Sequence, residues 1–172
     1  MSFTNAKEHL KKYSLDNKIM EFDSSSATVK EAAAAIGCNE EEIAKTLSFS
    51  VNDKTILIVT AGDQKIDNAK FKAEFHTKAK MLSFEEVEIL VGHAVGGVCP
   101  FGIKDNVAVY LDVSLQRFAA VYPACGSSNS AVQLTLQELE QSCEYQKWVD
   151  VCKNMGWDLE IDCEPTLSNI NL

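Results

Sequence analysis

The sequence predicts a single α/β domain in which a mixed β-sheet is covered by flanking helices. Capping boxes, in which Ser or Thr is followed three residues later by Glu, mark several helix starts. Apolar segments with the spacing of β-strands lie between them in an irregular order. Because the 172 residues contain no repeat, linker or break in composition, we expect one domain over residues 1–172. Its core is expected at about 20–144, with a C-terminal appendage at 145–172.

Helix starts are predicted where a capping residue precedes an apolar stretch with helical spacing. Thr28 and Glu31 form such a box ahead of a helix through residues 32–36, which Gly37 is expected to end. The further predicted starts are Asn39 before a short turn at 40–43, Ser83 before a helix that ends ahead of Gly92, and Thr135 before a later helix.

Four apolar segments are predicted to be strands, at residues 46–51, 55–60, 107–111 and 118–122. The first alternates, and residues 52–54 are expected to turn the chain into the second. Because the second is rich in β-branched residues, we expect it to be a buried central strand. The fourth is predicted to pair with the third across a short connection.

The composition argues against a membrane-spanning or exported protein. Hydrophobic residues make up 46% of the chain and charged residues 24%, which is typical of a globular protein. No apolar run approaches the ~20 residues that cross a bilayer, and residues 1–12 lack the features of a secretory signal. None of the six cysteines forms a CxxC pair. We therefore expect a cytoplasmic protein with reduced thiols and neither metal nor cofactor.

The formal net charge of −9 disfavours a partner bound through phosphates over a broad face. The charge is uneven, however, because a run of lysines follows Asp63: Lys65, Lys70, Lys72, Lys78 and Lys80. This run predicts either a local basic patch for RNA or a solvated surface without a partner. We expect no interaction with DNA or with membranes.

Lys45 begins the first predicted strand, where a helical turn gives way to Thr46 and Leu47. The apolar side chains that follow at every second position share one face of the strand. We therefore expect Lys45 at the edge of the sheet, where it can project into a cleft. Many lysines at strand ends are merely solvated, whereas a desolvated lysine can hold a phosphate or a polarised carbonyl.

Residues 92–102 contain four glycines and a proline, which indicates a loop that approaches another group closely or adopts positive φ. Such a loop can aim free amides at a phosphate or a developing oxyanion, with a tight structural turn as the alternative. A third segment, residues 124–131, places small hydroxyl residues directly after a strand, which suits a turn that lines a ligand or a plain polar turn. Its serines form no GxSxG elbow, so serine hydrolase chemistry is poorly supported.

In this order, the three segments resemble those of the YbaK/EbsC family, which includes the editing domain of prolyl-tRNA synthetases. The matching landmarks are Lys45-Thr46-Leu47, residues 56–62 with the following Asp63, the Gly-Gly-Val-x-Pro-Phe-Gly loop at 96–102, the strand through Asp112 and the turn at Gly126-Ser127. They extend from about residue 29 to residue 139. Among the branches of the family, the chain is most similar to the free-standing prolyl-tRNA editing proteins called ProX or ProXp.

The resemblance implies a compact fold with a barrel-like mixed sheet, and hydrolysis of the ester that joins a wrong amino acid to a tRNA, commonly tRNA for proline. The lysine that the family requires matches Lys45, and the loop that matches Gly96 and Gly97 lines the aminoacyl pocket. We expect Lys45 and the amides of Gly96 and Gly97, which would stabilise the oxyanion, to be the catalytic groups. The expected partners are the acceptor end of an aminoacyl-tRNA and, as a further candidate, prolyl-tRNA synthetase. The other residues expected to contact substrate are Thr46, His93, Cys99, Pro100, Gly126, Ser127 and Ser128.

Departures from related branches leave the amino acid open among small ones such as Ala, Ser and Cys. Thr46 stands where alanine-editing relatives carry Asn, and Cys99 stands where a serine is common. Residues 126–129 replace the Gly-Gly-x-Arg-Gly pattern of cysteine-editing relatives. Two other functions remain open: a non-catalytic module that binds an acceptor end, a nucleotide or a synthetase, and a thiol-dependent protein that uses Cys99 or Cys125 with His93.

Overall fold

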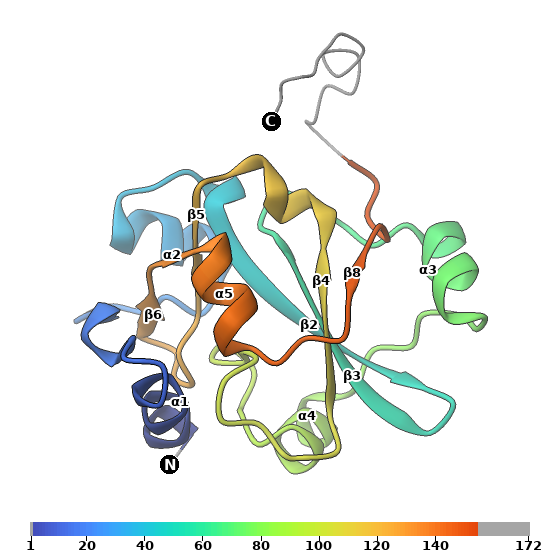
Figure 1. Cartoon of the computed structure of the whole chain (residues 1–172), viewed down its shortest axis with the longest axis horizontal. Helices are drawn as coiled ribbons and strands as arrows, with labels where there is room; N and C mark the ends of the chain where they lie inside the picture. The colour runs from blue at the N-terminus through green and yellow to red at the C-terminus, as the bar shows by residue number, and fades with distance from the viewer. Residues whose placement is uncertain (1, 155–172) are drawn as a thin grey trace, which may run out of the picture.

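The computed structural model describes residues 2–154 and is built around a six-stranded sheet (Figure 1). The strand order is β7-β5-β2-β3-β4-β8. The strands are β2 (Ile43–Val51), β3 (Lys54–Ala61), β4 (Ala108–Asp112), β5 (Ala120–Pro123), β7 (Leu134–Thr135) and β8 (Trp148–Val149). Antiparallel pairs join β2 to β3 and β5 to β7, whereas β2–β5, β3–β4 and β4–β8 are parallel, so the sheet is mixed as predicted.

Helices lie around this sheet, and a small second sheet pairs β1 (Ile19–Glu21) with β6 (Ser130–Val132). The α-helices of the described chain are α1 (Ser2–Lys11), α2 (Val29–Ile36), α3 (Asn68–Phe75), α4 (Phe84–Leu90) and α5 (Leu136–Ser142). Short 3-10 turns are η1 (Asp16–Lys18), η2 (Glu40–Glu42) and η3 (Val113–Arg117). In Figure 1, α3 lies on one side of the β2–β3 hairpin, and α1, α2 and α5 lie on the other. The curled sheet with flanking helices confirms the predicted fold class.

The capping residues begin helices for the reason that the sequence predicts. Thr28, Ser83 and Thr135 each accept a hydrogen bond from the amide three residues along the chain, at 3.1–3.2 Å. The glutamate at that third position accepts a bond from the capping residue's amide in return. Gly37 ends α2 with a φ of 87°, a conformation that favours glycine.

Both faces of the sheet are covered, and β3 is buried along most of its length, which confirms the predicted central strand. Leu57 and Val59 belong to the larger core, to which α1, α4 and α5 contribute. Ile58 faces the other way, into a smaller core with Phe49 of β2 and Phe71 of α3. The rings of Phe49 and Phe71 lie 5.0 Å apart between centroids, so α3 closes this face.

The pairing of β5 differs from the prediction. β5 does not pair with β4 but lies parallel to β2, with Tyr122 opposite Ile43. The cause is η3, which follows β4 at once and carries the chain across the end of β3. The Asp112 carboxylate accepts a bond from the Ser114 amide at 2.9 Å, and Ser114 Oγ accepts one from the Ala61 amide at 3.1 Å.

Helices α1 and α3 are absent from the sequence prediction because each buries few apolar side chains: Ala6 and Leu10 in α1, and Phe71 in α3.

Of the predicted C-terminal appendage at 145–172, residues 145–154 are described and the remainder lies outside the described residues. Its strand β8 extends the sheet beside β4, with Trp148 opposite Leu111, and an isolated bridge joins Cys152 to Ile66.

Candidate active site at the start of strand β2

A cavity of about 250 Å³ opens beside the first half of β2 and brings together the three segments singled out in the sequence. From these segments it is lined by residues 44–47 of β2, by Val95, Gly96 and Val98 of the glycine-rich loop, and by Ala124, Ser130 and Ala131 around the turn after β5. The approach to α2 and the start of α4 complete its wall. Segments that are far apart in the chain therefore meet at one site.

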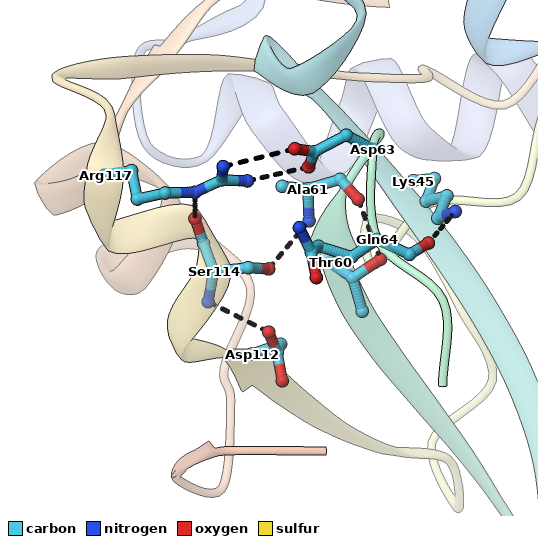
Figure 2. Close-up of polar contacts among 8 residues, drawn as sticks. All are labelled: Lys45, Thr60, Ala61, Asp63, Gln64, Asp112, Ser114 and Arg117. Carbon is cyan, nitrogen blue, oxygen red and sulfur yellow. Dashed lines mark hydrogen bonds and ion pairs between the residues drawn. The ribbon is translucent and has the colours of Figure 1, made fainter. Parts of the chain in front are cut away.

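Lys45 is the one charged side chain among the described residues that line this cavity. β2 is an interior strand, and Lys45 lies near its first end, where its side chain lines the cavity. Its ammonium group donates a hydrogen bond to the backbone carbonyl of Gln64, just beyond β3 (Figure 2). Burial lowers the pKa of the Lys45 ammonium, and the neighbouring Cys152 and Asp63 oppose that effect.

An ion pair lies next to Gln64. Arg117 of η3 donates to both carboxylate oxygens of Asp63, at 2.7 and 3.2 Å, and its Nε donates to the Ser114 carbonyl at 2.9 Å (Figure 2). Burial alone would raise the pKa of the Asp63 carboxyl, but hydrogen bonds and the charge of Arg117 outweigh it and hold this pKa below its usual value.

Gly96 and Gly97 have different positions at the cavity. Gly96 lines it and has a φ of 100°, which favours glycine. Gly97 lies behind the wall, where an added Cβ would stand 2.6 Å from the amide nitrogen of Ser127. The Gly97 amide donates to the Ala94 carbonyl at 3.0 Å, and its carbonyl accepts from the Gly126 amide at 3.0 Å. Gly97 thus joins the glycine-rich loop to the turn after β5.

Thr46 lines the cavity next to Lys45, but its hydroxyl oxygen is buried and has no hydrogen-bond partner among the described residues. Ser127 and Ser128 of the turn lie behind the wall. Ser127 and Ser130 share a hydrogen bond at 2.5 Å between their hydroxyl oxygens, and the Ser128 carbonyl accepts from the Ser26 amide at 2.7 Å. Of these serines, Ser26 and Ser130 line the cavity.

His93 and Cys99 are fully buried and do not line the cavity. The Nε2 atom of His93 lies 2.7 Å from the Phe101 carbonyl, which can only accept, so Nε2 carries the proton and donates it. Cys99 Sγ, 3.5 Å from the same Nε2, therefore has no base to receive its proton there. Burial raises the pKa of the Cys99 thiol and lowers that of the His93 imidazole. This arrangement disfavours the thiol-dependent alternative at Cys99.

Pro100 and Gly126 also lie outside the cavity wall. Pro100 borders a separate hollow beside α1, and an added Cβ on Gly126 would meet the Ser2 carbonyl oxygen at 2.5 Å.

The sequence did not predict three parts of the site: the approach to α2, the exposed Phe84 on the rim and the Gln64 carbonyl. The capping box after Ser26 could have indicated the first, but the Gln64 contact uses a backbone atom and leaves no signal in the sequence.

Four of the five lysines in the run after Asp63 are exposed: Lys65, Lys72, Lys78 and Lys80. Lys70 instead pairs with Asp150 at 3.1 Å and donates to the Cys152 carbonyl at 2.8 Å.

Within residues 2–154, no group of three or more His, Cys, Asp or Glu side chains lies in a place to hold a metal ion. In the same part of the chain, no helix has the length and apolarity to cross a membrane.

The sequence profile of a family described as the aminoacyl-tRNA editing domain matches residues 23–141. The chain belongs to this family. This editing domain is 50% identical over 155 residues to the Bacillus subtilis (strain 168) protein YwhH, described as uncharacterized, with 90% of this chain and 99% of that protein covered. It is 29% identical over 136 residues to EbsC of Enterococcus faecalis (strain ATCC 700802 / V583), named as a proposed Cys-tRNA(Pro)/Cys-tRNA(Cys) deacylase, with 76% and 82% covered.

The fold of the editing domain matches a solved structure as well. The crystal structure of a proposed trans-editing enzyme for prolyl-tRNA synthetase superposes with a TM-score of 0.80 and 28% sequence identity, over 88% of this chain and 97% of that one. The family resemblance expected from the sequence is therefore confirmed. The matched range 23–141 leaves out α1 and also β8, which both belong to the described structure.

Proposed function

We propose that this editing domain is a deacylase that acts in trans on mischarged tRNA, with tRNA for proline carrying a small wrong amino acid as its substrate. One observation carries the proposal: Lys45 is the charged side chain of the described cavity wall, where the three segments meet. At about 250 Å³, the cavity is below the usual ~300–1,000 Å³ range for small-molecule pockets, which favours a small aminoacyl group. We place the reaction in the cytoplasm, where charged tRNA is used.

The ester of an aminoacyl-tRNA is already activated, so its hydrolysis needs positioning and charge stabilisation more than a strong nucleophile. An ammonium group has three N–H donors, and the bond to Gln64 leaves donors on Lys45 for the substrate carbonyl or the terminal phosphate. The attacking water loses a proton as its oxygen adds to the ester carbon. The ribose oxygen takes up a proton as its bond to that carbon breaks.

The oxyanion formed by this attack requires a further donor in the cavity wall. We assign this role to the amide of Gly96, which lines the cavity. The Gly97 amide is used in the bond to Ala94, so we assign Gly97 to packing of the loop. Among the hydroxyl residues that line the cavity, we assign contacts with the amino acid to Thr46, whose hydroxyl has no partner among the described residues.

A non-catalytic module that binds an acceptor end, or accompanies prolyl-tRNA synthetase, is the second candidate. The net charge of −9 favours it, because a protein recruited by a synthetase needs little affinity of its own for tRNA. Lys45 discriminates between the two functions, since turnover depends on this side chain whereas recruitment does not.

The test is to incubate the purified protein with proline tRNA charged separately with alanine, serine, cysteine and proline, and to follow loss of the ester against buffer. We expect hydrolysis of a wrong charge with prolyl-tRNA spared, and at least a ~100-fold lower rate for Lys45→Ala, as when a preorganised donor is removed. Lys54→Ala is the matched control, because Lys54 is exposed at the β2–β3 turn.

Full activity of Lys45→Ala would contradict the proposed role of Lys45. If the unaltered protein hydrolyses none of these substrates but retains one of these tRNAs or prolyl-tRNA synthetase in a binding assay, the second candidate replaces the first.

A further inference from the structure

The Lys45 ammonium is held by a main-chain carbonyl, so the position of that carbonyl determines where the charge lies in the cavity wall. Gln64 is fully buried and follows β3 after a turn through Gly62 and Asp63. Substitution of its side chain leaves the carbonyl chemically unchanged. The location of the carbonyl depends on what fixes the turn, to which the Gln64 side chain contributes through its hydrogen bond with Asp63.

On one side, the turn is anchored to η3 by the pair of Asp63 and Arg117 (Figure 2). The planar guanidinium meets both carboxylate oxygens, a geometry that fixes orientation as well as distance. Only 17% of the Arg117 side chain and 26% of the Asp63 side chain are exposed, so solvent screens this pair less than a surface pair. A third bond, from Arg117 Nε to the Ser114 carbonyl, ties the guanidinium to its own turn.

On the other side, the residues after Gln64 are anchored to the segment that follows β8. The Lys153 amide donates to the Lys65 carbonyl at 3.0 Å, and the Asp67 amide donates to the Val151 carbonyl at 2.8 Å. Gln64 thus lies between two fixed points of the backbone.

Asp112 at the end of β4 joins these two anchors. It is fully buried, and its two carboxylate oxygens accept bonds from the amides of Ser114 and Val151, each at 2.9 Å. One carboxylate therefore holds both η3, which carries Arg117, and the segment that pairs with residues 65–67. Neither Arg117 nor Asp112 lines the cavity, so both can affect it only through other residues.

We propose that Asp63 and Arg117 are positioning residues, whose ion pair sets the place of the Lys45 ammonium through the carbonyl of Gln64. The catalytic consequence of this pair rests on the function proposed above. Asp63 has a second effect, because its negative charge raises the pKa of Lys45. Cys152 acts in the same direction, whereas Lys65 lowers this pKa. Arg117 carries a positive charge, so its loss cannot lower the pKa of Lys45 in this way, which allows the two roles to be separated.

The kinetic test compares Asp63→Asn and Arg117→Gln with the unaltered protein on its mischarged substrate. We expect kcat to fall about 10- to 100-fold, as for a small displacement of a catalytic group, with KM within about twofold. Arg117→Lys keeps the charge without the planar fork and should recover part of kcat. The control is Lys18→Ala, which breaks a 2.7 Å ion pair with Glu138 away from the cavity and should leave kcat unchanged.

Folding is checked in each variant by circular dichroism and by its unfolding midpoint. If a single variant does not fold, it is replaced in the comparison by the double variant Asp63→Arg with Arg117→Asp, which restores opposite charges at the two positions. A kcat of this double variant above that of the single variants that do fold supports the proposal.

A second readout titrates the Lys45 ammonium by nitrogen NMR, with its signal assigned from Lys45→Ala. Asp63→Asn should lower the pKa of Lys45, because a negative charge is removed, whereas Arg117→Gln should change the ammonium signal without lowering that pKa. If the ion pair had a purely structural role, both variants would lower the stability of the protein without this difference in the pKa of Lys45.

The outcomes separate the two proposals. If the unaltered protein is active but both variants match Lys18→Ala in kcat, the positioning role is overturned and the proposed function stands. If the unaltered protein is inactive, the proposed function fails, and the NMR titration still decides positioning. An unchanged Lys45 signal and pKa in both variants would then overturn it.

Discussion

Thr46 combines two properties at the scale of a single residue: it lines the cavity next to Lys45, and its hydroxyl oxygen is buried without a partner among the described residues. A buried hydroxyl without a hydrogen bond destabilises the folded state by about 1–3 kcal/mol. A rotation about its side-chain bond would exchange this oxygen for the methyl group. A polar atom of a bound amino acid could then provide the missing bond.

Thr46→Val should therefore raise the free energy of unfolding by about 1 kcal/mol, because valine has the same shape without the hydroxyl. Urea unfolding measures this change, and Thr46→Ser, which keeps the hydroxyl, is the control that should show no gain. If the hydroxyl contacts substrate, the same variant raises KM. A lower stability of Thr46→Val would instead show that the hydroxyl is already satisfied in solution.

Two loops form the cavity wall together at the scale of structural elements. The glycine-rich loop contacts the turn after β5 through Gly97, whose backbone lies too close to Ser127 to admit a side chain. The bond from the Gly126 amide to the Gly97 carbonyl fixes the same contact. Because Gly96 precedes this contact directly, its position in the wall depends on it.

Gly97→Ala should lower the free energy of unfolding by about 1–3 kcal/mol, the usual effect of overpacking, and should also lower kcat. Gly37→Ala is the matched control. Gly37 has positive φ but nothing within 4 Å of an added Cβ, so its substitution strains the end of α2 away from the loop. It should reduce stability by about 1 kcal/mol and leave kcat unchanged. Equal kcat losses in the two variants would contradict a specific role for the contact between loop and turn.

At the scale of the whole molecule, His93 links folding to pH. It is fully buried, and burial lowers the pKa of its imidazole in the folded state. Below the usual histidine pKa of ~6.5, the unfolded chain therefore binds a proton that the folded chain does not. The free energy of unfolding must fall as the pH is lowered from about 6.5 towards the folded-state pKa.

Urea unfolding at about pH 7.5 and pH 5.5 should show this loss of stability in the unaltered protein. His93→Asn should be less stable at both pH values because it disturbs the bond to Phe101, but the difference between the two should be smaller. The same loss in both proteins would assign the pH dependence to other groups.

Much of the local structure follows from the sequence. The capping boxes at Thr28, Ser83 and Thr135, the end of α2 at Gly37 and the burial of β3 depend on residues a few positions apart, and the structure confirms them. The sequence likewise indicates the segments around the cavity, because their residue types are unusual for segments that only support the fold. Their chemical roles stay a prediction.

Only the tertiary structure decided which groups meet. Arg117 and Asp63 lie 54 positions apart, and their contact depends on η3 crossing the end of β3 instead of continuing into a hairpin with β4. The acceptor for Lys45 is a backbone carbonyl, and every residue carries one, so no residue type could point to Gln64. The sequence by itself determined the capped helices, the central strand β3 and the lysine near the first end of β2. The surroundings of that lysine follow from the order of strands in the sheet, because this order brings distant backbone segments into contact.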